Sequence, residues 1–257
     1  MGKEFFTLEA SKTIVKLFDE AARNTGHGRG WVFSDFLTVA RCALAGQTME
    51  DEYHETIQKG YTDGEPGGRG IDTLKTAFHL MIGAMEDTGQ DVLGDVFQGA
   101  IPYGKNGQFS TPGSVCNLMA NLTVPADRTD EPRTINDPAC GSGRQLLAVA
   151  KRQPHWEFTG QDVDHRCVQM TAINMGLNGL RGWAVWQNTL TLETHRVYKV
   201  GFNRFGGVIR ELPVAGSPFD DQTIEKTDSQ SPSAQPVTIS NEEPPPHSET
   251  PSQLDLF

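Results

Sequence analysis

The chain has 257 residues, 37% hydrophobic and 21% charged, which is enough for one or two domains with a substantial core. No apolar run reaches the roughly 18 to 20 residues that a membrane span needs, and the N-terminal stretch is amphipathic and acid-containing rather than signal-like, so we expect a cytosolic protein. The formal net charge of −11 argues against a strongly basic nucleic-acid-binding protein.

The negative charge is concentrated at the C-terminal end. From Gly216 onward the sequence has eight acids and one base, which leaves a net charge of only −4 on the first 215 residues. Nucleic-acid binding by that part of the chain therefore remains open. The four cysteines lie far apart without a Cys-x-x-Cys pair, so we expect reduced thiols rather than a zinc site or a disulfide framework.

The first ninety residues are predicted to form helices. Apolar residues recur at helical intervals between Phe5 and Phe18, and Ser34 is placed to cap a helix over "DFLTVARCALA". Two further helical segments, "EDEYHETIQKGY" and "IDTLKTAFHLMIGAMED", are separated by a glycine-rich loop. These patterns predict an N-terminal helical bundle.

From Thr134 the pattern changes to short β-type runs that alternate with helical ones. The order is "RTIND", "RQLLAVAKR", "EFTGQDV", "HRCVQMTAINMGLNG" and "GWAVWQN", which predicts a βαβαβ unit. Pro154 after the first helix and Asn178-Gly179 after the second are suitable helix ends. Right-handed crossovers then predict a parallel sheet with helices packed on it.

The stretch "NDPACGSGRQLLAVAKR", residues 136 to 152, places a glycine-lined turn between the first strand and the first helix of this unit. Such a turn lets backbone N–H groups approach a nucleotide-like or carboxylate-bearing ligand, and a following helix start adds positive potential. Asp162 ends the next strand, where an acid can reach ribose hydroxyls. The alternative is a tight turn needed only for packing.

The amino-acid sequence of this turn resembles motif I of adenine-N6 DNA methyltransferases, in particular the modification subunits of type I restriction systems. In that family the loop holds the methionine part of S-adenosylmethionine. The resemblance implies a Rossmann-like methyltransferase core with DNA and a specificity or partner methylase subunit as partners. The residues of the matching phrase are Asp137, Pro138, Ala139, Cys140, Gly141, Ser142 and Gly143.

A second phrase, "GQFSTP" at residues 107 to 112, is similar to the same family's motif X, which also contacts the cofactor; the residues concerned are Phe109, Thr111 and Pro112. A plainer interpretation of part of this phrase is a helix with Thr111 as N-cap and Pro112 at its first position. The resemblance extends from about Asp91 to Asn188, and it implies that Asp162 contacts the ribose and Val163 the adenine ring.

The sequence departs from the family at two points. Asn188 stands where the family has an aspartate that accepts from the adenine amine; an amide oxygen still accepts but carries no charge. The family's Asn/Asp-Pro-Pro-Tyr/Phe motif, whose polar groups accept both hydrogens of the target amine while the aromatic ring stacks on the flipped base, is missing or degenerate. At its expected position stands "GFNRFGG", in which Asn203 and Phe205 are the candidate catalytic residues.

After about residue 213 the sequence is rich in Ser, Thr, Pro, Gln and acids, and we expect a disordered linker over residues 214–252. The chain ends in "QLDLF", which resembles the peptide by which bacterial replication and repair proteins bind the sliding clamp of DNA polymerase III. A glutamine anchor and apolar side chains on a disordered tether fit such a linear motif, and a chance apolar ending is the alternative. The peptide comprises Gln253, Leu254, Asp255, Leu256 and Phe257.

The expected organisation is therefore a helical region over residues 1–90, an abbreviated α/β methyltransferase core over 91–213, a disordered linker over 214–252 and a clamp-binding peptide over 253–257. Two functions are compatible with the sequence. One is an adenine-N6 methyltransferase-like protein that binds S-adenosylmethionine and DNA and is tethered to the clamp. The other is a catalytically inactive adaptor that keeps the fold and acts through DNA or clamp contacts.

Overall fold

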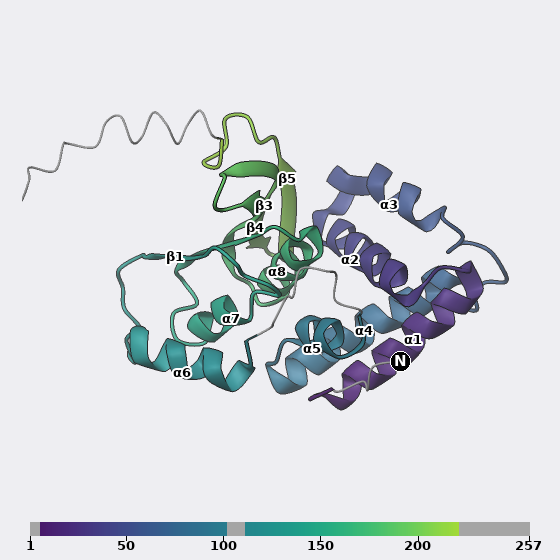
Figure 1. Cartoon of the computed structure of the whole chain (residues 1–257), viewed down its shortest axis with the longest axis horizontal. Helices are drawn as coiled ribbons and strands as arrows, with labels where there is room; N and C mark the ends of the chain where they lie inside the picture. The colour runs from purple at the N-terminus through teal and green to yellow at the C-terminus, as the bar shows by residue number, and fades with distance from the viewer. Residues whose placement is uncertain (1–5, 102–110, 221–257) are drawn as a thin grey trace, which may run out of the picture.

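The computed structural model describes residues 6–101 and 111–220 (Figure 1). Phe109 and the C-terminal peptide 253–257 lie outside the described residues, as does most of the expected linker. Six α-helices precede the first strand in the described part of the chain: α1 (Glu9–Thr25), α2 (Arg29–Ala45), α3 (Glu50–Ile57), α4 (Gly70–Thr88), α5 (Val92–Ala100) and α6 (Gly113–Thr123). A short 3-10 turn, Gly46–Met49, joins α2 to α3.

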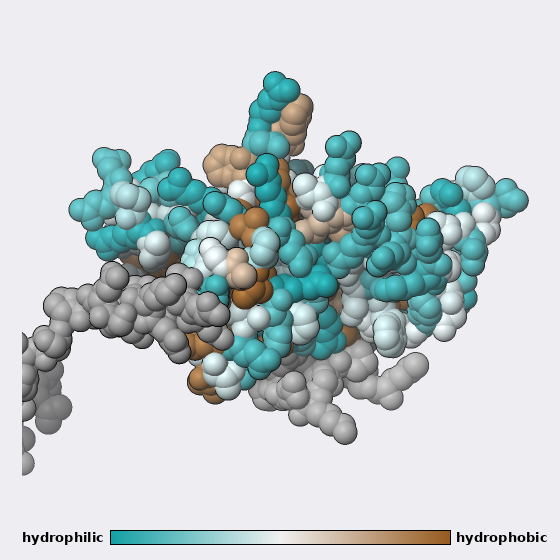
Figure 2. Space-filling view, turned by 90° about the horizontal axis from the view of Figure 1, so that it is seen from above, coloured by the Kyte–Doolittle hydropathy of each residue, from teal (hydrophilic) through white to brown (hydrophobic). Residues whose placement is uncertain are grey.

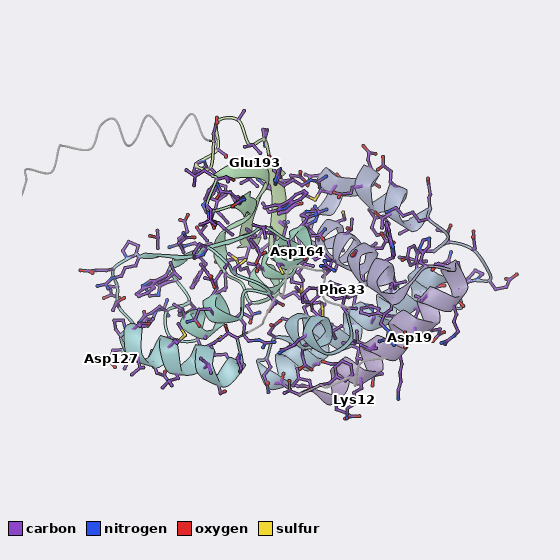
Figure 3. The ribbon with its side chains drawn as sticks, viewed as in Figure 1. Lys12, Asp19, Phe33, Asp127, Asp164 and Glu193 are labelled. Carbon is purple, nitrogen blue, oxygen red and sulfur yellow. The ribbon has the colours of Figure 1, made fainter. Side chains whose placement is uncertain are left out.

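The helical prediction for the N-terminal region is confirmed. Helix α1 buries Ile14, Val15 and Phe18 at helical spacing. These side chains meet α2, where Phe33 and Phe36 contact the Phe18 ring at centroid distances of 6.0 and 4.9 Å. Phe33 lies among the helices in Figure 3, whereas Lys12 and Asp19 lie on the outside of α1. Figure 2 shows a mainly hydrophilic surface over this helical region, at the right of the view.

The predicted start of α2 was wrong. Ser34 does not cap the helix; the helix begins five residues earlier, at Arg29, after Gly28 in an extended conformation. Ser34 instead donates from its hydroxyl to the carbonyl of Gly30, 3.1 Å away. A serine inside a helix can satisfy its hydroxyl in this way, so its presence alone does not mark a helix start.

The β-type runs form one five-stranded sheet in the order β1-β2-β3-β4-β5. The sequence β1 (Thr134–Asp137), α7 (Arg144–Ala150), β2 (Glu157–Asp162), α8 (His165–Leu177), β3 (Arg181–Asn188) is the predicted βαβαβ unit, with β1, β2 and β3 parallel. The sheet is not wholly parallel as expected, because β4 (Glu193–Asn203) and β5 (Gly206–Leu212) form an antiparallel hairpin that extends the sheet beyond β3. The core is thus α/β and Rossmann-like with a mixed sheet.

Helices α7 and α8 cover the same face of the sheet. Consecutive strands step in one direction, and right-handed crossovers then place both helices on one side. Helix α8 packs against β2, β3, β4 and β5 and also against α2, so the helical region and the sheet share one hydrophobic core. On the opposite face, Phe219 from the segment after β5 packs edge-on against Trp183 at a centroid distance of 5.7 Å.

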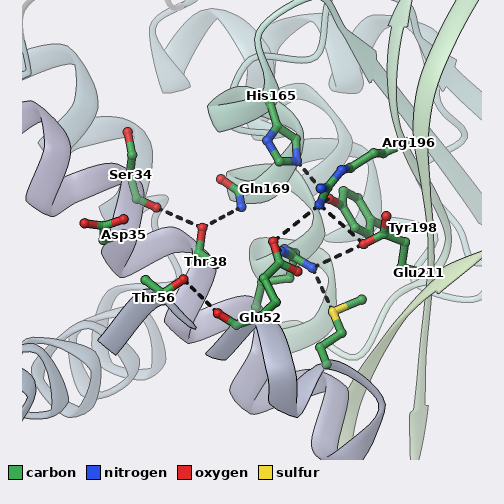
Figure 4. A network of polar contacts seen from close by, with 12 residues as sticks. Ser34, Asp35, Thr38, Glu52, Thr56, His165, Gln169, Arg196, Tyr198 and Glu211 are labelled. Atoms are coloured by element: carbon green, nitrogen blue, oxygen red, sulfur yellow. Dashed lines mark hydrogen bonds and ion pairs between the residues drawn. The ribbon is translucent and has the colours of Figure 1, made fainter. Parts of the chain in front are cut away.

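A buried polar network joins the helical region to the antiparallel hairpin (Figure 4). The fully buried Arg41 of α2 lies 2.7 Å from the Glu52 carboxylate of α3 and 3.8 Å from Glu211 of β5. Its guanidinium also lies over the Tyr198 ring, 4.8 Å from the centroid. Arg196 of β4 completes the cluster with ion pairs of 3.3 Å to Glu52 and 3.5 Å to Glu211. The network fixes β4 and β5 against α2 and α3.

Candidate functional site

The turn between β1 and α7 is built around two glycines in left-handed conformation. Gly141 has φ +56° and Gly143 has φ +82°, values that residues with a Cβ adopt only with strain. The amide of Cys140 donates to the Gln161 carbonyl of β2 (2.9 Å), and the amide of Gly143 donates to the Cys140 carbonyl (2.8 Å). The backbone therefore folds back tightly at the carboxyl ends of two neighbouring parallel strands.

The two faces of this turn differ in how closely they are packed. A Cβ added to Gly143 would lie 3.1 Å from the Thr171 hydroxyl of α8, and one added to Gly160 of β2 would lie 2.8 Å from the Thr171 methyl group. Thr171 also donates to the Gly141 carbonyl (3.0 Å). A Cβ on Gly141, by contrast, would meet nothing within 4 Å. The turn is pressed against α8 on one side and open at Gly141 on the other.

Two carboxylates lie beside the open side of the turn. Asp162, at the end of β2, accepts from the Gly141 amide (3.0 Å) with one oxygen and from the Asp164 amide (2.9 Å) with the other. Asp137, at the end of β1, accepts from the Ala139 amide (3.2 Å). Asp164, the N-cap of α8, lies near the centre of the molecule in Figure 3.

Burial raises the pKa of both Asp137 and Asp162 above the usual range of an aspartate. In the case of Asp162, the neighbouring charges of Asp164 and Asp137 add to this effect. The protein thus holds carboxylates together where their ionised forms are disfavoured, and a cationic ligand would relieve that penalty. This chemistry suits a ligand that combines a positive charge with hydroxyl groups.

Asp91 supports the turn from beneath and was not recognised as a site residue from the sequence. It is the N-cap of α5, accepting from the Gly94 amide (2.8 Å), and it is 6% exposed. The same carboxylate accepts from the Ser142 hydroxyl (2.5 Å), from Asn174 of α8 (2.8 Å) and from the guanidinium of Arg144 (3.1 Å). The sequence signal was the start of the family resemblance at about Asp91, which assigned this residue no role.

The remaining predicted cofactor residues flank the turn. Val163 is 55% exposed, directly after Asp162. Asn188 ends β3 at the same sheet edge, but its amide oxygen accepts from the amides of Leu190 (3.0 Å) and Thr191 (3.4 Å), so it already shapes the β3–β4 loop. From that loop, Thr189 donates to the Pro138 carbonyl (3.3 Å).

Thr111 and Pro112 lie next to the start of α7, because the Thr111 carbonyl accepts from Arg144 (3.2 Å). Thr111 is not the N-cap of α6, as the sequence suggested. Pro112 occupies that position with φ −57° and ψ 141°, and its carbonyl accepts from the amides of Val115 and Cys116. The helix therefore begins one residue later than predicted.

Asn203 and Phe205 are not brought together with these residues. Because β4 runs antiparallel to β3, Glu193 pairs with Asn188 at the edge that carries the turn, while Asn203 lies beyond the opposite end of β3. Both candidate catalytic residues belong to the exposed turn of the β4–β5 hairpin, where Asn203 accepts from the Phe205 amide (2.8 Å). The structure therefore separates them from the cofactor residues, and their catalytic role stays a prediction.

A cavity of about 650 Å³ lies behind the turn, between the start of α6, helix α7 and the α4–α5 loop. It is lined in part by Asp91, Pro112, Asn117, Arg144 and Lys151. The carboxylates of Asp137 and Asp162 are not in its lining, so the cavity adjoins the candidate site without containing its acidic groups.

No helix in the described part of the chain is long and apolar enough to cross a membrane.

Comparison with known proteins adds a family match to this geometry. The family model described as N-6 DNA Methylase matches residues 88–242, more than half of the chain. The chain is also similar to the methyltransferase subunit of a type I restriction-modification system from Streptococcus thermophilus, with 14% identity, a TM-score of 0.37, and coverage of 68% of this chain and 57% of that one.

A structure described as a class I S-adenosylmethionine-dependent methyltransferase from Listeria monocytogenes matches with 16% identity, a TM-score of 0.34, and coverage of 68% of this chain and 52% of that one. The chain thus spans less than two thirds of the length of either solved structure. No curated protein matches the sequence.

Proposed function

The chain belongs to the N-6 DNA Methylase family, and from that premise we propose that it binds S-adenosylmethionine at the β1–α7 turn and acts on DNA. The observation that carries the proposal is the open turn at Gly141 beside two carboxylates with raised pKa. S-adenosylmethionine carries a sulfonium and an ammonium group, so its charge complements these acids. Such a protein would act in the cytoplasm, where the DNA is.

Each residue of the turn has a defined part in this proposal. Gly141 allows the ligand to approach the backbone, because no side chain occupies the space beside it. Asp162 accepts hydrogen bonds from the ribose hydroxyls, and Val163 packs against the adenine ring with its exposed side chain. Asp91 holds Ser142 and Arg144 in place beneath the turn. When bound, the cofactor supplies an activated methyl group.

Calorimetric titration of the full chain with S-adenosylmethionine and with its demethylated product tests cofactor binding. Asp162→Asn keeps the shape of the side chain but removes its charge, and we expect it to weaken S-adenosylmethionine binding by about tenfold or more. Asp63→Asn, which removes a charge from an exposed loop, is the matched control and should bind normally. No saturable heat with either compound for the wild-type protein would refute the proposal.

Methyl transfer to adenine N6 additionally needs a pocket for the target base. Asn203 and Phe205 lie at the end of the strands opposite the cofactor turn. This placement favours two possibilities: a second polypeptide supplies the target pocket, or the chain is a non-catalytic adaptor that retains the cofactor fold. Labelled S-adenosylmethionine and adenine-containing DNA distinguish them. Incorporation only in the presence of a partner methylase or specificity subunit supports the first, and cofactor binding without incorporation in either condition supports the second.

The Asn203→Ala variant separates the original catalytic hypothesis from both possibilities. If Asn203 accepted a hydrogen from the target amine, the variant would lose incorporation while still binding cofactor. Unchanged incorporation would remove Asn203 from the mechanism.

The C-terminal sequence Gln253–Phe257 supports tethering to the sliding clamp. An apolar, glutamine-led peptide at the end of a long polar segment is able to reach a pocket on a partner while the folded part samples nearby DNA. Deleting the last five residues should abolish co-elution with the bacterial clamp on gel filtration. Co-elution that survives the deletion would end this part of the proposal.

A further inference from the structure

A row of cationic and aromatic side chains crosses the sheet on the face opposite α7 and α8. Trp183 of β3 pairs with Lys199 of β4, and Lys199 pairs with Arg210 of β5, so the three side chains stand side by side. The Lys199 ammonium lies 5.1 Å from the centre of the Trp183 ring, which confirms that both project from one face. Arg181 precedes Trp183 by two residues and therefore projects from that face too.

The positive charges of this row are not neutralised within the described residues. Arg181, Lys199 and Arg210 of the row, and Arg204 of the β4–β5 turn, are all exposed, and none has a carboxylate within 4.0 Å in the described part of the chain. Arg181 donates to the backbone carbonyl of His155 (2.7 Å). Glu157 of β2 lies beside the row and accepts from the Trp183 indole (2.9 Å). A cluster of uncompensated cations is notable in a chain of net charge −11.

The β4–β5 turn, which lies beyond the row along the hairpin, adds an exposed aromatic side chain. Phe205, in the turn itself, is 81% exposed. The Arg204 guanidinium carbon lies 4.5 Å from the centre of the Phe205 ring. An exposed ring beside basic side chains is typical of surfaces on which bases stack while phosphates are held by the basic groups.

We propose that this surface, formed by Arg181, Trp183, Lys199, Arg204, Phe205 and Arg210, binds the sugar–phosphate backbone of DNA, with Phe205 stacking on an unpaired base. The occupant is chosen by charge complementarity, since a polyanion neutralises four cations at once. The choice of DNA rests on the proposed function, whereas the position of the surface does not. The β4–β5 end of the surface lies at the opposite end of β3 from Asn188 and the cofactor turn, so it would hold DNA outside the site of chemistry.

Fluorescence anisotropy with labelled single-stranded oligothymidine and with a labelled duplex tests the proposal on the full chain. Lys199→Glu combined with Arg210→Glu should weaken binding of both probes at least tenfold and reduce the slope of log affinity against log salt by about 2. Lys16→Glu combined with Lys75→Glu makes the same change in net charge at two exposed lysines of α1 and α4 and should have little effect. Phe205→Ala should weaken binding of the single strand about tenfold and leave the duplex unchanged.

Three results would overturn the proposal. The first is no binding of either probe by the wild-type protein at low salt, and the second is equal loss in the two double variants, which would reduce the effect to net charge. The third is an unchanged affinity in Lys199→Gln with Arg210→Gln, a milder pair that keeps the hairpin folded. Calorimetry with S-adenosylmethionine on the same proteins separates the proposal of cofactor binding from the proposal of DNA binding at this surface. Intact cofactor binding without DNA binding would refute only the second.

Discussion

At the scale of single residues, Asp137 in the turn between β1 and α7 lowers the stability of the folded protein at neutral pH but favours a cationic ligand. Its side chain is partly buried at the end of a strand and accepts one backbone amide. Burial raises its pKa, so the native protein binds the proton more tightly than the unfolded chain does. Stability contributed by this group therefore decreases as the pH rises from the unfolded pKa through the folded one, and at neutral pH the ionised carboxylate is destabilising.

The Asp137→Asn variant should accordingly be more stable at neutral pH, with a melting temperature a few degrees higher, because the amide still accepts from Ala139 without the charge. The gain should disappear in acid, where the wild-type carboxyl is protonated. The same variant should lose more affinity for S-adenosylmethionine than for its demethylated product, which keeps the ammonium and carboxylate groups but lacks the sulfonium charge. Thermal melts from pH 4 to pH 7 and paired titrations measure both effects, and a lower melting temperature at pH 7 would contradict the assignment.

The two turn glycines should respond differently to alanine. Both have positive φ, so each substitution introduces backbone strain of roughly 1–2 kcal/mol. Gly143→Ala also places a Cβ 3.1 Å from Thr171, whereas Gly141→Ala meets nothing within 4 Å. We expect Gly143→Ala to lower the free energy of unfolding more, and Gly141→Ala to act mainly on ligand affinity. Urea unfolding of the two variants measures this difference. Equal losses in the free energy of unfolding would contradict it.

At the scale of elements, α6 differs from the other helices because its outer face is apolar. Val115, Leu118, Met119 and Leu122 follow helical spacing and are 41 to 77% exposed, while Cys116 and Ala120 are buried toward α7. Helix α7 shows the reverse, with Leu146 fully buried. The hydrophobicity of a residue type thus does not reveal on which side of a helix the core lies.

The stability cost of truncating leucines should follow this difference. Leu146→Ala leaves a cavity in the shared core and should cost about 2–5 kcal/mol. Leu122→Ala removes a side chain that is 77% exposed and should cost less than about 0.5 kcal/mol. The comparison uses one substitution type in two adjacent helices, measured by denaturant unfolding. A large loss for Leu122→Ala would mean that α6 packs against something in solution.

At the scale of the whole molecule, the helical region and the sheet are joined by a common core and by the Arg41 network. Burial by itself would lower the pKa of Arg41, but Tyr198 and Glu52 outweigh it, so the guanidinium stays charged. His165 beside Tyr198 behaves oppositely: burial, with Arg196 and Arg41 nearby, lowers its pKa to about 4, and it is neutral at physiological pH. Removing one member of such a cluster leaves the others without compensation.

Arg41→Ala should therefore cost about 3–5 kcal/mol, and the helices and the sheet should still unfold in one transition. Far-ultraviolet circular dichroism reports mainly on the helices, and fluorescence is emitted by all four tryptophans, two of which lie in β3. Lys75→Ala, an exposed change on α4, is a suitable control with little expected effect. Separate transitions for the two signals in the wild-type protein would show that the shared core does not couple them.

The sequence by itself determined the features that depend on neighbours along the chain. Hydrophobic periodicity identified the first four helices and the βαβαβ unit, and the segment Asp137–Gly143 located the turn, because positive φ at Gly141 and Gly143 is a local requirement. The tertiary structure alone decided which way β4 runs, and that direction carries Asn203 and Phe205 to the far edge of the sheet. It also decided that Asp91, 51 residues before Ser142, supports the turn. Strand direction and contacts between distant residues depend on how whole elements pack, and no local pattern encodes that packing.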